Sequence, residues 1–121
     1  MSQRAHKFGA KTVITLEGER FDSTGAFHYF QQLKLLEKAG KIERVERQIP
    51  YVLTVNGMMV AKIVVDFKVT IPGKGIHVGE FKGMITPVAR LKIKMFKAQY
   101  QIPFHLIRLG EPDTLLAEIP R

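Results

Sequence analysis

An aspartate, a glutamate and a lysine stand where the chain otherwise favours buried strands. Asp66 interrupts the apolar run Ile63-Val64-Val65-Asp66-Phe67, and Glu80 precedes Lys82 by two residues. A carboxylate inside such a run is costly to bury unless another group compensates its charge. Because side chains alternate along a strand, Glu80 and Lys82 project to the same face. These three residues are therefore the first candidates for catalysis.

A turn at Pro72-Gly73-Lys74-Gly75 separates the two carboxylates and predicts antiparallel pairing of their strands. A connection of about three or five residues would bring Asp66 directly opposite Glu80, with Cβ atoms about 4.5–5.5 Å apart. Two carboxylates at that separation repel unless a cation lies between them. Their oxygen atoms favour a hard ion such as Mg²⁺ or Mn²⁺. Ordinary charged residues on a solvated strand are the alternative interpretation of the same spacing.

The surrounding sequence predicts a mixed β-sheet flanked by two helices, an α/β (α+β) fold. Asn56-Gly57 lies between two apolar runs and is typical of a hairpin, because both residues tolerate a positive φ. The expected strands are 12–16, 51–55, 58–69, 76–82 and 104–109. The expected helices extend from a cap at residues 22–24 to Gly40, and from Thr86-Pro87 to about Gln101.

The second expected helix carries a narrow basic stripe, because an advance of about 100° per residue brings its cations together. The stripe consists of Arg90, Lys94 and Lys97. The apolar residues expected to face away from it are Val88, Leu91, Met95 and Phe96. Since this helix follows Glu80 and Lys82 directly, the stripe is predicted to bind a phosphate backbone beside the metal. A solvated amphipathic face is the alternative.

The composition fits one basic domain. The 121 residues include 19 Lys and Arg against 11 Asp and Glu, a formal net charge of +8 at pH 7. Such a charge attracts nucleic acid or another acidic partner. We expect a single domain over residues 1–121, with a loose basic arm at 1–11. The C-terminal tail at 110–121 is expected to cover the core or to mediate contacts.

The lack of cysteine excludes disulfides and thiolate metal sites, and it favours a cytoplasmic location. No apolar run is long enough to cross a bilayer, and none follows the basic start of the chain, so neither a membrane span nor a signal peptide is predicted. The four histidines, expected at the surface or its boundary because they lack zinc-ligand spacing, are His6, His28, His77 and His105.

Several short segments between residues 7 and 108 follow one another in a specific order. They are Lys7-Phe8-Gly9-Ala10-Lys11, Arg20-Phe21-Asp22-Ser23, residues 33–42, Gln48-Ile49-Pro50, Val65-Asp66-Phe67, Glu80-Phe81-Lys82-Gly83 and Thr86-Pro87. Together they resemble small phage-encoded proteins of the PD-(D/E)xK nuclease superfamily, which includes restriction endonucleases and Holliday-junction resolvases. For a phage-encoded protein, the cytoplasm would be that of the bacterial host.

The resemblance implies a restriction-endonuclease-like core and a metal held by Asp66, Glu80 and the carbonyl of Phe81. It also implies that Lys82 orients or activates the attacking water, and that Gln48 lies near the site and orients substrate or a metal-bound water.

One position departs from the family pattern. The usual glutamate of the first helix is Ala26 here, on the stripe that faces the sheet. Asp22, Glu17 or Glu46 could replace it, or a single metal could bind. A third possibility is that the protein holds DNA without cutting it.

Two main hypotheses follow. The first is a Mg²⁺-dependent endonuclease that hydrolyses DNA, with branched or recombination-intermediate DNA as a candidate substrate and a homodimer as the candidate assembly. The second is a nuclease-fold protein that binds nucleic acid or a phage or host protein without hydrolysis. A weaker third hypothesis is a basic adaptor that dimerises through the tail at residues 110–121.

Overall fold

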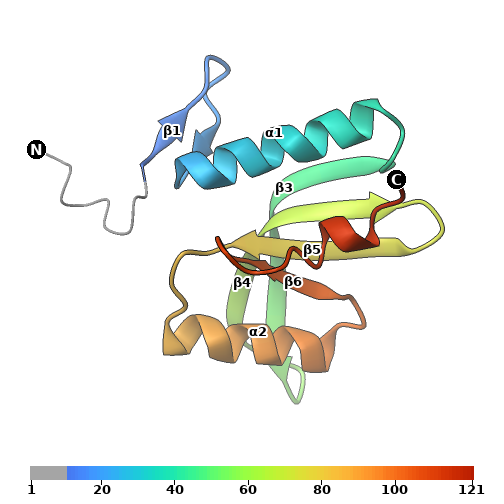
Figure 1. Cartoon of the computed structure of the whole chain (residues 1–121). Coiled ribbons are helices and arrows are strands. Elements are labelled where there is room, and N and C mark those ends of the chain that lie inside the picture. The colour runs from blue at the N-terminus through green and yellow to red at the C-terminus, as the bar shows by residue number, and fades with distance from the viewer. Residues whose placement is uncertain (1–10) are drawn as a thin grey trace, which may run out of the picture.

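The elements of the chain form a mixed sheet with one helix on either side of it (Figure 1). The structure, a computed structural model, describes residues 11–121. In chain order the elements are β1 (Val13–Ile14), β2 (Arg20–Phe21), α1 (Thr24–Lys38), β3 (Arg44–Val55), β4 (Met58–Ile71), β5 (Gly75–Phe81), α2 (Pro87–Gln99), β6 (Phe104–Ile107) and the short 3₁₀ helix η3 (Leu116–Glu118). The predicted fold class is thereby confirmed.

The main sheet has the strand order β3-β4-β5-β6. The first two neighbouring pairs are antiparallel and the last pair, β5 with β6, is parallel. A parallel pair needs a crossover connection, and α2 supplies it. The short strands β1 and β2 form a separate antiparallel ladder before α1. β5, the strand that carries Glu80, therefore lies between β4 and β6.

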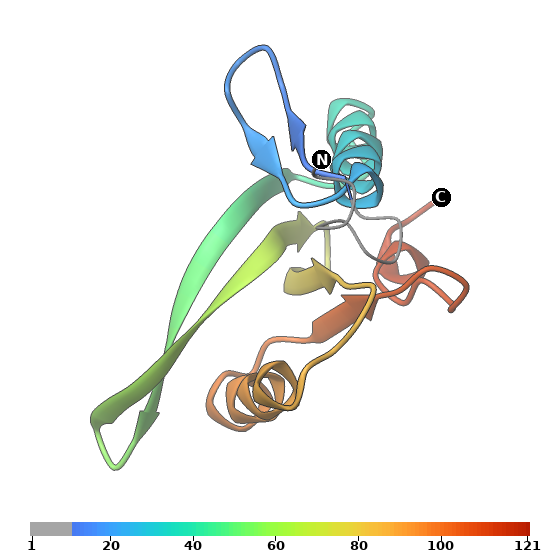
Figure 2. The same cartoon turned by 90° about the vertical axis from the view of Figure 1, so that its left-hand side faces the viewer.

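The hairpin between β3 and β4 turns at Asn56-Gly57, as predicted. Both residues have positive φ, 50° and 79°, which is the requirement of a type I′ turn. β3 begins at Arg44, earlier than expected, because the polar residues after it pair with the far end of β4. β5 pairs only with residues 67–71 of β4, so the outer half of the hairpin extends beyond the rest of the sheet (Figure 2).

α1 begins and ends where the sequence predicts, and α2 begins at the predicted Thr86-Pro87 but ends at Gln99, slightly before the expected end. The hydroxyl of Ser23 accepts the N–H of Ala26 at 3.0 Å, and Gly40 with φ 78° follows the end of α1. At α2 the hydroxyl of Thr86 accepts the N–H of Ala89 at 3.1 Å, with Pro87 in the first turn. Side-chain caps of this kind satisfy N–H groups that the helix leaves without partners.

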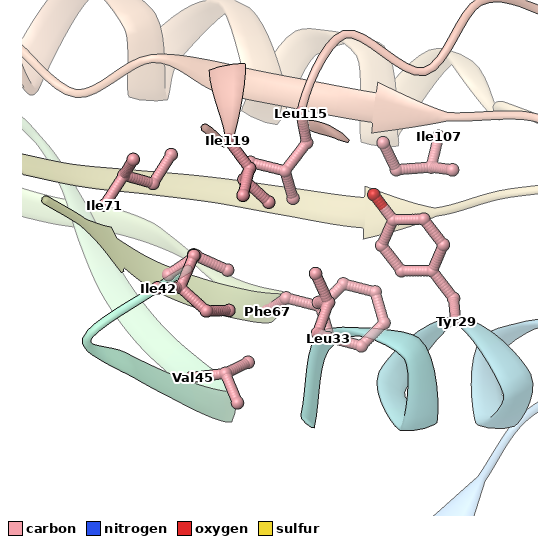
Figure 3. Close-up of a cluster of buried hydrophobic side chains, with 10 residues drawn as sticks. Tyr29, Leu33, Ile42, Val45, Phe67, Ile71, Ile107, Leu115 and Ile119 are labelled. Atoms are coloured by element: carbon pink, nitrogen blue, oxygen red, sulfur yellow. The ribbon is translucent and has the colours of Figure 1, made fainter. Parts of the chain in front are cut away.

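Two clusters of buried side chains share the sheet. The first cluster joins α1, the inner part of the sheet and the C-terminal tail (Figure 3). Its fully or nearly fully buried members are Tyr29, Leu33, Ile42, Val45, Phe67, Val69, Ile71, Ile107, Leu115 and Ile119. The second cluster joins α2 to the outer hairpin and to β5, and consists of Leu53, Ile63, Val65, Val78 and Phe96. The tail therefore covers the core, one of its two expected roles.

The apolar residues of α2 expected to face away from the basic stripe do not all pack against the protein. Phe96 is buried and Met95 packs partly buried against the second cluster, but Val88 and Leu91 are 63% and 57% exposed. Ala89 and Ile93 face the protein with Phe96 instead, and they share a stripe at helical spacing. Two apolar stripes compete on this helix, and the one that continues to the aromatic Phe96 packs against the sheet.

The prediction for two histidines is wrong, because His77 and His105 are buried. Nδ1 of His77 lies 2.9 Å from Nε2 of His105, and Nδ1 of His105 lies 2.7 Å from Oγ1 of Thr114. The parallel pairing of β5 with β6 brings these two rings together, stacked 5.1 Å apart. His28 is exposed as expected.

Two other expectations concern the ends and surroundings of the chain. His6 and residues 1–10 of the expected basic arm lie outside the described residues. Among residues 11–121, the structure contains no helix that is both long and apolar enough to span a membrane.

Candidate active site

The carboxylate of Asp66 lies at the point where β4 and β5 separate. The last paired residues of the two strands are Phe67 and Gly79, so Glu80 occupies the position across from Asp66. Instead of a further ladder bond, Oδ2 of Asp66 accepts the backbone N–H of Phe81 at 2.9 Å. Asp66 thus satisfies a donor that the parting strands leave open, and the predicted juxtaposition of the two carboxyl-bearing residues is present.

Glu80 and Lys82 lie side by side at the end of β5. Glu80 is only 5% exposed, and its Oε2 lies 3.7 Å from Nζ of Lys82. The N–H of Lys82 donates to the carbonyl of Ile107 at 2.9 Å, which continues the parallel ladder with β6. The backbone that carries the lysine is therefore fixed, while its ammonium group stays partly open to solvent.

Gln48 reaches the site because the backbone of β3 bends there. The backbone φ of Gln48 is 56°, a value that residues other than Gly, Asn and Asp rarely adopt. Nε2 of Gln48 donates to Oδ1 of Asp66 at 3.2 Å. Backbone strain of this kind gathers at functional sites, where surrounding contacts hold it in place.

Both carboxyl groups have a raised pKa, and the charge of Asp66 contributes to the raised pKa of Glu80. Burial is the main cause of the raised pKa of Asp66, which the Phe81 N–H, Lys82 and Gln48 partly offset. Burial is also the main cause of the raised pKa of Glu80, where Lys82 acts against it and Asp66 acts with it. A buried carboxylate beside a half-buried one is an arrangement that a bound cation stabilises, because the cation offsets their repulsion.

The donor set fits a hard divalent cation that keeps several water ligands. The available donors are the carboxylates of Asp66 and Glu80 and the carbonyl of Phe81, all oxygen atoms, which Mg²⁺ and Mn²⁺ prefer. Within residues 11–121, no three His, Asp or Glu side chains converge closely enough to hold an ion by themselves. Mg²⁺ commonly binds through one or two carboxylates together with water and substrate phosphate.

No acidic side chain stands at the position of the usual helix glutamate. Ala26 is 8% exposed and faces the core, as predicted. Of the three acids considered as replacements, Asp22 is close enough to raise the pKa of Asp66, although Asp22 itself is solvent-exposed. Glu46 is engaged with Lys68 at 3.8 Å, and Glu19 rather than Glu17 pairs with Arg47.

A hollow of about 660 Å³ opens beside Asp66, between the start of α1 and the ends of β4 and β5. Polar and charged side chains that line it are Gln48, Asp66, Lys82, Asp22, Arg20 and Arg47. Neither arginine is among the site residues predicted from the sequence. The guanidinium of Arg47 stacks 3.8 Å from the ring centre of Phe21 and donates to the carbonyl of Arg20.

The start of α1 approaches this hollow closely because Gly25 has no side chain. A Cβ atom at Gly25 would come within 2.6 Å of the ring of Phe81. The glycine thus lets Phe81 pack under the helix, and this packing helps to fix the peptide between Glu80 and Lys82. The sequence offers no signal for this role, since Gly25 there looks like an ordinary glycine in a first helical turn.

The basic stripe of α2 lies apart from the carboxylates. Arg90, Lys94 and Lys97 are exposed, and none of them lines the hollow that contains Asp66. Their binding of a phosphate backbone stays a prediction.

A family model of known protein sequences matches most of the chain. The family model described as "Protein of unknown function (DUF1064)" matches residues 5–108, a range that includes every candidate site residue. No curated protein and no solved structure matches the chain.

Proposed function

The chain belongs to the family of proteins of unknown function DUF1064, and from the site itself we propose that it is a metal-dependent endonuclease that hydrolyses DNA phosphodiester bonds. One observation carries the proposal. The half-buried Asp66 and the buried Glu80 lie across from each other where β4 and β5 part, with the ammonium of Lys82 3.7 Å from Glu80. Paired carboxylates beside a lysine are suited to hydrolysis of a phosphodiester with a metal ion.

Each side chain has a defined task in this proposal. Asp66, Glu80 and the carbonyl of Phe81 would hold Mg²⁺ or Mn²⁺, which supplies positive charge to the scissile phosphate. Lys82 orients the attacking water and stabilises the negative charge that develops on its oxygen. Gln48 fixes the orientation of the Asp66 carboxylate through its 3.2 Å hydrogen bond.

A cleavage assay tests the proposal. Wild type, Asp66→Ala and Lys82→Ala are incubated with labelled duplex, single-stranded and four-way-junction DNA, with EDTA, Mg²⁺ or Mn²⁺. Wild type is expected to cut in either metal but not in EDTA, Asp66→Ala to show only background, and Lys82→Ala to lose about 10²–10⁴-fold in rate. No cleavage of any substrate by wild type in either metal would refute the proposal.

Lys68→Ala is the matched control for this assay. Lys68 lies two residues from Asp66 on the same face of β4, and its ammonium lies 3.8 Å from Glu46 rather than beside Glu80. Its replacement removes a nearby positive charge and leaves the proposed machinery in place, so its cleavage rate is expected to stay within about twofold of wild type.

A second candidate function is binding of nucleic acid without hydrolysis. It is favoured by Ala26, because the helix position that carries a glutamate in the resembled nucleases is apolar and buried here. Binding of DNA by wild type without metal-dependent cleavage would support it.

Cutting of both strands of a duplex requires two sites, so the homodimer remains the predicted assembly for that substrate.

A further inference from the structure

A second hollow is lined by Glu80 but not by Asp66. It measures about 350 Å³ and is bordered by β4, the end of β5 and the first turns of α2. Glu80 and Lys82 form one wall, and Lys62 and Lys92 are contributed by β4 and α2. Lys82 is the one residue that lines both this hollow and the hollow beside Asp66. The proposed catalytic lysine therefore borders both hollows.

The second hollow has an excess of positive charge. Three lysines line it against the single carboxylate of Glu80. Within residues 11–121, no carboxylate lies within ion-pair distance of Lys62 or Lys92. Lys92 is nevertheless near enough to Glu80 to lower the pKa of that carboxyl group. Like charges gathered from separate elements repel, and a bound anion relieves that repulsion.

The walls of the hollow indicate which kind of anion fits. Val64 and Val88 also line it, and they are 40% and 63% exposed. A nucleic-acid strand alternates sugars with phosphates. The valines of this hollow could contact the sugars and its lysines the phosphates. The hollow includes Lys82, so a strand that places one phosphate at Lys82 and continues into the hollow runs toward Lys62 and Lys92, which line the same hollow.

We propose that Lys62 and Lys92 bind the DNA phosphate next to the scissile one, so that the cut strand passes from the hollow at Asp66 over Lys82 and between β4 and α2. This inference rests on the proposed nuclease function and assigns a different path from the stripe Arg90, Lys94 and Lys97. Lys92 lies on the side of α2 that faces Glu80, whereas Arg90 and Lys94 border a separate surface depression.

Equilibrium binding in EDTA tests the path without cleavage. The affinity of wild type for fluorescein-labelled single-stranded and duplex DNA is measured by anisotropy over a range of salt concentrations. The same is done for the double variant Lys62→Gln/Lys92→Gln, and polyglutamate is included as a competing polyanion. The double variant is expected to bind at least about tenfold more weakly near 0.1 M salt, and its log Kd against log salt slope is expected to fall by about one for each lysine.

Two further double variants give the comparison. Lys94→Gln/Lys97→Gln removes the same charge from the outer side of α2 and represents the competing path. Lys38→Gln/Lys41→Gln removes it at the C-terminal end of α1, and its affinity is expected to stay within about threefold of wild type. Greater loss in Lys94→Gln/Lys97→Gln than in Lys62→Gln/Lys92→Gln would overturn the inference. Tighter binding of polyglutamate than of DNA would overturn it in favour of an acidic protein.

A single substitution keeps the test valid if the double variant fails to fold. Val88→Glu places a negative charge at the rim of the hollow on a side chain that is 63% exposed, and it is expected to weaken DNA binding about tenfold. Wild-type affinity in Val88→Glu would count against the path.

Failure of this inference can be told from failure of the proposed function. If wild type cuts DNA and Lys62→Gln/Lys92→Gln retains the wild-type KM, the path is wrong and the nuclease stands. If the two lysines are required for DNA binding but wild type never cuts, the strand path stands and the nuclease is wrong.

Discussion

The carboxylate of Asp66 accepts the backbone N–H of Phe81 at 2.9 Å, so the aspartate fixes the peptide group between Glu80 and Phe81. This bond ties the geometry of one proposed metal ligand to that of the other two. A change of charge at either carboxylate should therefore be felt in stability as well as in metal binding.

Glu80→Gln is expected to stabilise the metal-free protein at pH 7. Burial raises the pKa of Glu80 above its ordinary value of 4.5, so the charged form is a cost to the folded state. Because the pKa of Glu80 is higher in the folded than in the unfolded chain, its protonated form contributes stability at a pH below the unfolded pKa. This contribution is lost as the pH rises through the folded pKa. Chemical denaturation should show an advantage for Glu80→Gln at pH 7 that shrinks toward pH 4.5.

Metal should reverse this order. At a metal concentration 100-fold above Kd, Mn²⁺ is expected to stabilise wild type by about 2.7 kcal/mol, and to stabilise Glu80→Gln much less. Equal Mn²⁺-induced shifts of the melting temperature in the two proteins would show that Glu80 is not a ligand.

Gln48→Gly is expected to separate stability from activity. Glycine adopts the φ of 56° without penalty, which favours the folded state by about 1–2 kcal/mol before the entropy cost of glycine. The variant also loses the hydrogen bond to Asp66, and cleavage is expected to fall about tenfold. Urea denaturation and the cleavage rate measure the two effects.

Asn56→Gly is the control for Gln48→Gly. Asn56 has a similar φ of 50° but lies at the tip of the hairpin, so its cleavage rate should not change. Full activity in Gln48→Gly would rule out the positioning role of the amide.

The buried histidine pair predicts a loss of stability in weak acid. Burial lowers the pKa of His77 and of His105 below the ordinary 6.5, and a charge on His77 lowers the pKa of His105 further. The unfolded chain therefore takes up protons more readily, and stability falls as the pH drops through 6.5 toward the folded values. Lys74, Glu118 and Asp113 also face these rings, and Lys97 acts on His105 from α2.

Denaturation at pH 7.5 and 5.5 measures this effect. His77→Gln/His105→Gln should lose much of the difference between the two pH values, whereas His28→Gln, an exposed histidine, should retain it. The same pH dependence in all three proteins would mean that other groups cause it.

Leu115→Ala is expected to cost about 2–5 kcal/mol in the free energy of unfolding. Leu115 is 0% exposed and anchors the tail in the first cluster, although it lies beyond β6. Leu109→Ala removes the same atoms from a side chain that is 92% exposed, and should change stability by less than about 0.5 kcal/mol. Similar unfolding curves for the two variants would contradict the anchoring role of the tail.

The features predicted correctly from the sequence depend on neighbouring residues. Asn56-Gly57 and Thr86-Pro87 carry their own turn and cap chemistry, so their positions were predictable. The position of Glu80 across from Asp66, one residue beyond the last ladder pair Phe67–Gly79, was predictable from strand alternation and one short turn. In each case a few adjacent residues determine the geometry.

The features missed depend on residues far apart in the chain. α2 has two apolar stripes, and only contact with the sheet selects the one that contains Ala89 and Phe96. His77 and His105 meet because β6 lies parallel to β5, a pairing made through α2. Lys62 comes from β4 and Lys92 from α2, and no local sequence pattern predicts that the two lysines line one hollow.

Both proposed carboxylate ligands stand at the border between the two buried clusters. On β4, Val65 belongs to the α2 cluster and Phe67 to the α1 cluster, with Asp66 between them. On β5, Val78 belongs to the α2 cluster and Phe81 packs against the other, with Glu80 between them. Interiors are close-packed, so a volume change in either cluster shifts the strand segment beside it. The packing of both clusters, and not of one alone, therefore sets the gap between the two carboxylates.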